Sequence, residues 1–356
     1  MRPYFVLWLF LAAMQVACTS AVAQRHRFVE TLQRLAVKVP EVAIANNGVY
    51  NALDQLTREP CDQEAIVGLG AALEKAGYRR EAANSHVGFS KACNGHPVSL
   101  RRAVNILLGL SDYPASIRVA TELIELEPLL DNGYFLRAVA HERGGDAKKA
   151  IDDYITATQL FPNKDEIANA SYFAMARLHD KLGQPCDAVN AIASWVALHP
   201  RNDSSQTRTA IQNYSAKGNC KVVKNEAEEV ITISKPGNVV RLTATINGVR
   251  GTFVLDTGAS FVSVRRSFAE KSKIEIDEDS SIQLHTANGV TAGKRGRAKA
   301  VQLKSLDAKD VAVVVQSDDK ATYGNGIDGL LGMSFLSRFN VTIERNAVRI
   351  SSRAPR

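Results

Sequence analysis

A repeated pattern in the first half of the chain is the feature that most constrains its fold. Four segments, each with a turn-forming start and a helix-forming continuation, read AGYRREA, SDYPASI, GGDAKKA and GQPCDAV, and they place Ala82, Ile117, Ala150 and Ala188 in corresponding positions. The steps between these positions are 35, 33 and 38 residues. Apolar residues also recur at intervals of three and four, which is the helix period. A repeat of this length is typical of stacked helical units, so residues 24–221 are predicted to form an all-α solenoid.

The same segments resemble the tetratricopeptide repeat. The tripeptides LEP, LFP and LHP, which end at Pro128, Pro162 and Pro200, keep the same spacing and would end one helix in each unit. The resemblance covers Gly77 to Pro200. It implies paired antiparallel helices stacked into a curved solenoid, whose concave face binds a peptide or protein partner. The alternative is that the helices only hold the attached domain at a distance or in a dimer.

Four cysteines of the helical half are predicted to form two disulfides. Cys61 opens one predicted helix and Cys93 closes the next, and an antiparallel hairpin brings such ends within disulfide reach. Cys186 and Cys220 bracket a second hairpin in the same way. Of the three connectivities that four cysteines allow, we therefore expect Cys61–Cys93 and Cys186–Cys220. An even set of cysteines is consistent with an oxidising compartment.

The first residues predict export. Arg2 precedes the apolar run 4–17, and Ala21-Val22-Ala23 offers the small-x-small pattern of a signal peptidase site, so residues 1–23 are expected to be a signal peptide. The alternatives are an uncleaved membrane anchor and a lipoprotein attached through Cys18, although the run is short for a spanning helix of ~20 residues. We therefore predict a periplasmic protein without a stable membrane span, with secretion or membrane anchoring as the alternatives.

Composition and charge exclude several classes of function. The 356 residues are 45% hydrophobic and 23% charged, which is typical of ordered globular protein. The net charge of +7 is spread along the chain without aromatic interleaving, so nucleic-acid binding is not expected. The seven histidines are scattered, with no HExxH motif and no Cys/His cluster, so we expect neither a metal site nor a cofactor.

The second half of the chain has the pattern of a small all-β domain. Residues 222–229 are predicted to be a polar, acidic linker, and from Val230 to the end at residue 356 the alternation changes to the strand period in VITISK, NVVRLTATI, GTFVLD, KAVQL, VAVVV, NVTI and AVRIS. Asn247-Gly248 and Asn288-Gly289 are the dipeptide that favours a type I′ hairpin turn. The chain is therefore a multidomain α + β protein.

The stretch GTFVLDTGASFVSV, residues 251–264, places an acid between two apolar runs and resembles the active-site loop of the retropepsin-like aspartic peptidases. Its context strengthens the resemblance, because Val254 and Leu255 precede the Asp-Thr-Gly, a hairpin LHTANGVTAG follows, and IDGLLGMSFL comes near the end. The resemblance covers about the last 120 residues. It implies that this half folds as one retropepsin-like lobe, a closed β-barrel.

The resemblance also assigns roles to individual residues. Asp256, Thr257 and Gly258 would form the catalytic loop, and Ser260 would support it by bonding the outer carboxylate oxygen. The remaining expected positions are the supporting Leu330, Leu331 and Gly332, which cross beneath the loop, and the flap residues Thr286, Ala287, Asn288 and Gly289, which close over an extended peptide.

Hydrolysis of an amide by this chemistry needs one group that takes a proton from water and another that gives one. Two carboxylates that share a proton can do both, and Asp256 supplies one, so a single lobe must form a homodimer about a two-fold axis. Asp328 is followed by Gly329 and two leucines instead of Thr-Gly, and we interpret it as a turn residue.

We therefore predict an exported aspartic endopeptidase whose helical repeats recruit a substrate or protein partner. The alternative is a periplasmic binding or scaffold protein with a catalytically silent peptidase-like domain.

Overall fold

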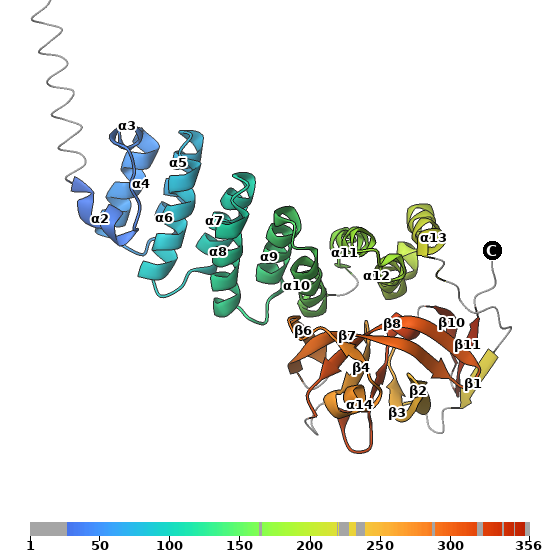
Figure 1. The fold of residues 1–356 in the computed structure, drawn as a ribbon. Helices are drawn as coiled ribbons and strands as arrows, with labels where there is room; N and C mark the ends of the chain where they lie inside the picture. The colour runs from blue at the N-terminus through green and yellow to red at the C-terminus, as the bar shows by residue number, and fades with distance from the viewer. Residues whose placement is uncertain are drawn as a thin grey trace, which may run out of the picture. The chain divides into compact units, whose positions relative to one another are not determined.

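The computed structural model of the chain describes residues 27–163, 166–218, 220, 228–232, 239–286, 289–318, 323–336, 338–344 and 346–352. The predicted signal peptide and residues 222–227 of the predicted linker lie outside these ranges. The chain divides into two compact units, one that ends at Gly144 and one that begins at Gly145 (Figure 1). The second unit therefore contains the last helices together with the β domain, a division different from the predicted change at residues 222–229.

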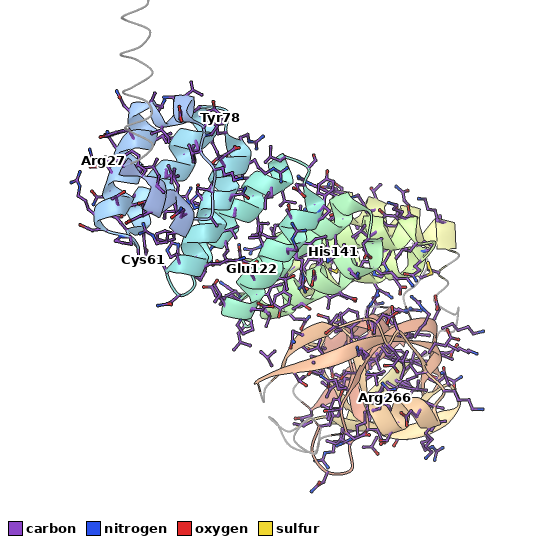
Figure 2. All side chains as sticks on the ribbon, turned by 60° about the vertical axis from the view of Figure 1, so that its left-hand side comes forward. Arg27, Cys61, Tyr78, Glu122, His141 and Arg266 are labelled. Atoms are coloured by element: carbon purple, nitrogen blue, oxygen red, sulfur yellow. A yellow bond between two sulfur atoms is a disulfide. The ribbon has the colours of Figure 1, made fainter. Side chains whose placement is uncertain are left out.

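The helical half consists of short helices in sequence order. In the first unit these are α2 (Val29–Arg34), α3 (Glu41–Ile44), α4 (Asn47–Arg58), α5 (Gln63–Lys75), α6 (Arg79–Ala92), α7 (Pro97–Gly109), α8 (Tyr113–Leu126) and α9 (Asp131–Gly144). In the second they are α10 (Ala147–Leu160), α11 (Ala170–Lys181), α12 (Pro185–Leu198) and α13 (Ser205–Gly218), with the 3₁₀ turn η2 (Pro200–Asn202) before α13. Within each unit, side chains fill the spaces between neighbouring helices (Figure 2).

The turns between paired helices have the same backbone conformation in each repeat. Gly77, Ser111, Gly145 and Gly183 all have positive φ, at +88°, +57°, +91° and +72°, and each lies two residues before the start of α6, α8, α10 or α12. This left-handed conformation is the one that glycine adopts without a steric penalty. Paired helices joined by a recurring turn confirm the predicted helical repeat.

One predicted position in the repeat is wrong by one residue. The residue equivalent to the fully buried Ala82, Ala150 and Ala188 is Ser116, which is also fully buried, while Ile117 is half-buried. The apolar character of Ile117 suggested the wrong alignment, because the hydroxyl of Ser116 is satisfied inside the helix by donating to the Asp112 carbonyl at 2.8 Å. A small residue is thus required here, and it need not be apolar.

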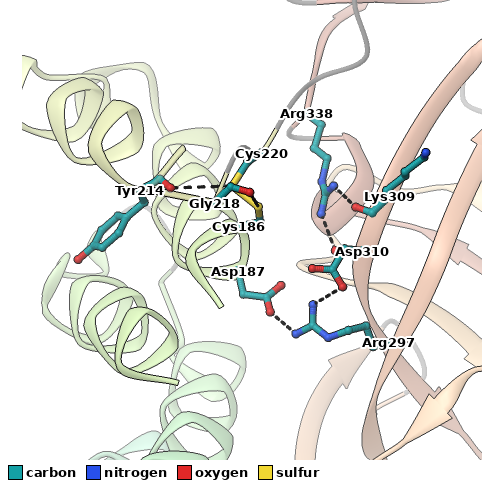
Figure 3. The surroundings of a disulfide bond; sticks show 9 residues. All are labelled: Cys186, Asp187, Tyr214, Gly218, Cys220, Arg297, Lys309, Asp310 and Arg338. Atoms are coloured by element: carbon teal, nitrogen blue, oxygen red, sulfur yellow. Dashed lines mark hydrogen bonds and ion pairs between the residues drawn. A yellow bond between two sulfur atoms is a disulfide. The ribbon is translucent and has the colours of Figure 1, made fainter. Parts of the chain in front are cut away.

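Both predicted disulfides are present. Cys61 and Cys93 lie with their Cα atoms 5.7 Å apart, and the bond joins the start of α5 to the end of α6. Cys186 and Cys220 lie with their Cα atoms 5.5 Å apart, and the bond joins the start of α12 to the residues after α13 (Figure 3). In the described ranges, no helix is both long enough and apolar enough to cross a membrane.

The β domain consists of two sheets and short helices. Its strands are β1 (Glu228–Thr232), β2 (Arg241–Ile246), β3 (Val249–Leu255), β4 (Val262–Arg265), β5 (Glu275–Ile276), β6 (Ile282–Thr286), β7 (Gly289–Leu303), β8 (Leu306–Gln316), β9 (Gly329–Leu331), β10 (Phe339–Ile343) and β11 (Ala347–Ser352). Helix α14 (Arg266–Lys271) follows β4, and α16 (Met333–Leu336) follows β9. The smaller sheet has the order β1-β11-β10 and the larger one the order β2-β3-β9-β4-β8-β7-β5, with β6 paired to β7.

Local turn chemistry fixes the first hairpin of the larger sheet. Asn247 and Gly248 join β2 to β3 and both have positive φ, at +49° and +84°, as a type I′ turn requires. Strand β2 also pairs with β7, which connects the first strand of the larger sheet to a later one. Closure of this domain into a barrel stays a prediction.

Candidate active site

The Asp-Thr-Gly loop leaves the sheet at the end of β3. Strand β9 lies between β3 and β4, parallel to the first, with Leu330 opposite Val254 and Leu331 opposite Leu255, and antiparallel to the second. Leu330 and Leu331 therefore pair with the end of the strand that leads into the loop, and their crossing beneath the loop stays a prediction. Two apolar residues are needed here because β9 is a central strand, with neighbours on both edges.

Main-chain hydrogen bonds hold the loop on β9. The Asp256 N–H donates to the Leu331 carbonyl at 3.2 Å, and the Met333 N–H donates to the Ala259 carbonyl at 2.8 Å. Gly332 lies between these two bonds, and a Cβ built on it would approach the Phe261 carbonyl oxygen to 2.1 Å. The glycine is therefore required by the close approach of two backbones.

The carboxylate of Asp256 is oriented by its own loop. Its Oδ1 accepts the Gly258 N–H at 2.9 Å, and the side chain is half-buried. Thr257 and Gly258 are exposed, and a Cβ added to Gly258 would approach only Asp256 Oδ1, at 3.2 Å. The three catalytic candidates thus lie together on an accessible loop with a rigid base.

The predicted flap corresponds to the hairpin of β6 and β7. The two strands pair antiparallel, and Thr286 lies opposite Gly289, whose φ is +107°. Ala287 and Asn288 lie outside the described residues. The backbone of the hairpin therefore occupies the expected place in the sequence, and its role as a flap stays a prediction.

Asp328 has a structural role at the base of the loop. Its Oδ2 accepts the Thr252 N–H at 2.8 Å, and its own N–H donates to the Thr252 carbonyl at 2.7 Å. These bonds connect the start of β9 to β3. The carboxylate thus helps to hold the two strands together.

Helix α10 contacts the β domain at residues that the sequence did not single out. The Thr156 hydroxyl accepts the Gln283 N–H at 3.0 Å on strand β6, and the Asp152 carboxylate accepts a main-chain hydrogen bond from Ser281. Four residues of a helix rise about 6 Å, which is close to the rise of about 6.7 Å for two residues of a strand. Residues four apart on the helix can therefore satisfy alternate N–H groups along the strand.

The same helix reaches the residues that follow the Asp-Thr-Gly loop. Gln159 Nε2 donates to the Ser260 hydroxyl at 2.7 Å, across 101 residues of sequence. This partner of Ser260 differs from the Asp256 carboxylate that the family resemblance suggests. Only the burial of polar side chains in α10 could have indicated the contact, and that burial cannot be recognised from the sequence because polar residues on a helix are usually exposed.

An ion-pair cluster lies where α10 meets β7. Arg295 Nε is 2.5 Å from Asp152 Oδ1, and Arg295 Nη2 is 3.0 Å from Asp277 Oδ2. Burial raises the pKa of the Asp152 carboxyl to about 7, although the nearby Arg295 guanidinium acts to lower it. The negative charges of Asp153 and Asp277 also raise the pKa of Asp152.

Replacing Asp152 with asparagine is expected to change the pH dependence of stability. A pKa raised from 3.8 to about 7 means that the folded protein binds a proton that the unfolded chain releases, so stability is lost as the pH rises from about 4 to about 7. Asp152→Asn should remove this loss, which is up to about 4 kcal/mol. Thermal unfolding followed across this range should show a smaller decline for the variant than for the wild type. Asp279→Asn, which changes an exposed acid, is the control and should decline like the wild type. An equal decline for Asp152→Asn and the wild type would contradict the raised pKa of Asp152.

Comparisons with known proteins were made for the whole chain. Residues 242–338 match the sequence family described as "gag-polyprotein putative aspartyl protease". Comparison with curated proteins gave no match. Among solved structures, a retropepsin-like aspartic protease from Rickettsia conorii is 21% identical with a TM-score of 0.28, and the match covers 35% of this chain and 91% of that one.

Two further solved structures are similar to the chain. MamA from Desulfovibrio magneticus RS-1 is 19% identical with a TM-score of 0.37, covering 52% of this chain and 97% of that one. A thermophilic TPR protein from Thermus thermophilus is 15% identical with a TM-score of 0.33, covering 55% of this chain and 98% of that one. The family match includes the Asp-Thr-Gly loop described above, so residues 242–338 are similar in sequence to putative aspartyl proteases, and the helices that precede them form a helical repeat.

Proposed function

We propose that the protein is an exported aspartic endopeptidase that acts as a homodimer. One observation carries the proposal: Asp256 lies on an accessible loop whose base is fixed to β9 by main-chain hydrogen bonds. A loop that only turned the chain would not need two apolar strands and a glycine packed beneath it. Two disulfides support export, since such bonds persist in oxidising compartments such as the periplasm.

The reaction proceeds through a water held between Asp256 and its copy in the second chain. The ionised carboxylate takes a proton from the water as the oxygen attacks the scissile carbonyl carbon, while the protonated carboxyl gives its proton to the carbonyl oxygen. Collapse of the tetrahedral intermediate breaks the C–N bond and passes a proton to the leaving nitrogen. The pair begins with one proton because two like charges this close cannot both ionise.

The neighbours of Asp256 have supporting roles in this proposal. Thr257 hydrogen-bonds across the dimer, and Gly258 allows the two loops to approach, for which the open space beside its Cα is suitable. Ser260 supports the loop and is itself held by Gln159. The β6–β7 hairpin closes over an extended peptide and adds main-chain hydrogen bonds to it, and the repeats recruit the substrate or a protein partner.

A subunit-mixing experiment tests the shared site. Wild-type chains are mixed with an excess of Asp256→Asn chains under conditions that exchange subunits, and cleavage of casein is measured per wild-type chain. We expect this activity to fall in proportion to the wild-type fraction of the chains, because each mixed dimer has lost one of its two essential carboxylates. An equal mass of inert protein is the control. If differently tagged chains co-purify as mixed dimers and the activity per wild-type chain stays constant, the shared-site mechanism is wrong.

A further inference from the structure

A cavity of about 410 Å³ lies between the last helical repeat and the sheet. It is bounded by α10, α11 and α12 on one side and by β5, β7 and β8 on the other, and it reaches Phe261, which follows the catalytic loop directly. We call it the repeat–sheet cavity. Its volume is within the range of about 300–1,000 Å³ that is typical of small-ligand and side-chain pockets.

The two arginines that line the cavity are already paired. Arg295 contacts Asp152 and Asp277, while Arg297 contacts the buried Asp187 of α12 and is 2.9 Å from Asp310 (Figure 3). Each guanidinium therefore has two carboxylate partners. A phosphate or another anion would have to displace these carboxylates to reach Arg295 or Arg297.

Two buried polar atoms of α12 have no hydrogen-bond partner among the described residues. They are Asp187 Oδ1 and Asn190 Nδ2, on side chains that are 3% and 8% exposed. Asp187 lines the repeat–sheet cavity, and both residues line a smaller recess that shares Phe261 with it and extends to Ser260. An unsatisfied buried donor or acceptor is costly, so these two atoms indicate a ligand that offers the opposite groups.

The two atoms complement a peptide amide. Asp187 Oδ1 can accept one N–H and Asn190 Nδ2 can donate to one carbonyl, and the residues are three apart on the same face of α12. The rest of the wall combines charged and polar side chains with apolar ones, among them Ile155, Leu182 and Val313. This lining fits a peptide main chain with one apolar side chain.

The position of the cavity connects it to the scissile bond. Phe261 is five residues from Asp256, so their Cα atoms are at most about 18 Å apart. An extended substrate covers this distance in about five residues. We infer that the repeat–sheet cavity is a substrate subsite, in which α12 binds a main-chain amide and the cavity takes an apolar side chain within about five residues of the cleaved bond. The inference rests on the proposed function and adds that the helical repeat itself contributes to specificity.

A binding experiment on the inactive full-length chain tests the subsite separately from catalysis. Immobilised Asp256→Asn chains are exposed to tryptic peptides of casein, and bound peptides are quantified by mass spectrometry. Adding Ala312→Phe, whose half-buried side chain lines both the cavity and the recess, should fill the space and weaken binding about tenfold or more. Ala300→Phe is the matched control on the neighbouring strand β7, outside the cavity lining, and should bind like the parent. Equal binding by all three chains would overturn the inference.

A second variant separates a binding role from a structural one. Asn190→Leu removes the unpartnered donor and keeps the branching and the number of side-chain heavy atoms, so the Asp256→Asn chain that carries it should unfold at the same or a higher temperature and still bind peptide several-fold less tightly. A lower unfolding temperature with unchanged peptide binding would mean that Asn190 is structural, and would overturn its assignment to the subsite.

Cleavage by the active chain distinguishes failure of the subsite from failure of the proposed function. The wild type and Ala312→Phe are given the same peptides, and the residues around each cut are compared. A changed preference at one or two positions supports the subsite, and an unchanged preference in an active variant overturns it while the peptidase stands. If the wild type cuts no peptide but Ala312→Phe still abolishes binding to the Asp256→Asn chain, the proposed function fails and the peptide site stands.

Discussion

Asp256→Asn is expected to lower peptide cleavage by several orders of magnitude. The amide keeps the size of the side chain and can still accept the Gly258 N–H, so the loop should keep its shape. It can neither take a proton from water nor share one with a second carboxylate, and each acid-base role typically contributes ~10²–10⁴-fold. The measurement is the rate of casein cleavage at equal protein concentration, with thermal unfolding to show that the fold is unchanged.

Two matched variants make this result specific. Asp279→Asn applies the same chemical change to an exposed acid of the same domain and should leave the rate unchanged. Asp328→Asn can still accept the Thr252 N–H and should remain active. If Asp328→Asn is inactive while Asp256→Asn cleaves like the wild type, the catalytic acid has been misassigned. If neither change matters, the domain is a binding module.

Under the proposed function, the wild-type protein should cleave peptides fastest on the acid side of neutrality. A pair of carboxylates that must hold one proton between them is competent only between its two apparent pKa values. Activity should be lost below the lower apparent pKa of the pair and above the higher one. The profile of cleavage rate against pH should therefore be bell-shaped.

Gly332→Ala is expected to destabilise the β domain severely. The new Cβ would lie 2.1 Å from the Phe261 carbonyl oxygen and 2.6 Å from that of Ala259, which are backbone atoms that cannot rotate away. Relief of the clash requires β9 or the catalytic loop to move, and the Met333–Ala259 hydrogen bond would be lost with it. Overpacking typically costs about 1–3 kcal/mol, and a clash with two backbone atoms should fall at the upper end of this range. Calorimetry should record a lower unfolding temperature for the second unit.

Gly258→Ala is the matched control for that change. Its Cβ would approach only Asp256 Oδ1, at 3.2 Å, so the unfolding temperature should stay close to that of the wild type. Under the proposed dimer the same change places two methyl groups where the loops meet, so cleavage should fall although the fold is kept. Unfolding of Gly332→Ala at the wild-type temperature would mean that β9 is not packed as described.

Local patterns were sufficient for much of the architecture. The helix period, the turn glycines and Asn247-Gly248 each act through a few neighbouring residues, so the helical repeat, the hairpin and the change to strands could be predicted. The cysteine pairs followed from the ends of helical hairpins and are present as Cys61–Cys93 and Cys186–Cys220. The position of Ile117 was wrong because burial was judged from apolar character, whereas the equivalent Ser116 is buried with its hydroxyl satisfied.

The sequence by itself determined the candidate catalytic loop, because Asp-Thr-Gly, its apolar flanks and the later Leu-Leu-Gly are contiguous motifs whose backbone requirements are local. Only the tertiary structure decided what surrounds that loop. Gln159 meets Ser260 across 101 residues, Thr156 meets Gln283 across 127, and Asp187 meets Arg297 across 110. Each of these contacts uses a common polar side chain of α10 or α12 whose partner is chosen by the packing of these helices on the sheet. A polar residue carries no signal of its distant partner, so the part of the site that the helical repeat contributes could be found only in the folded chain.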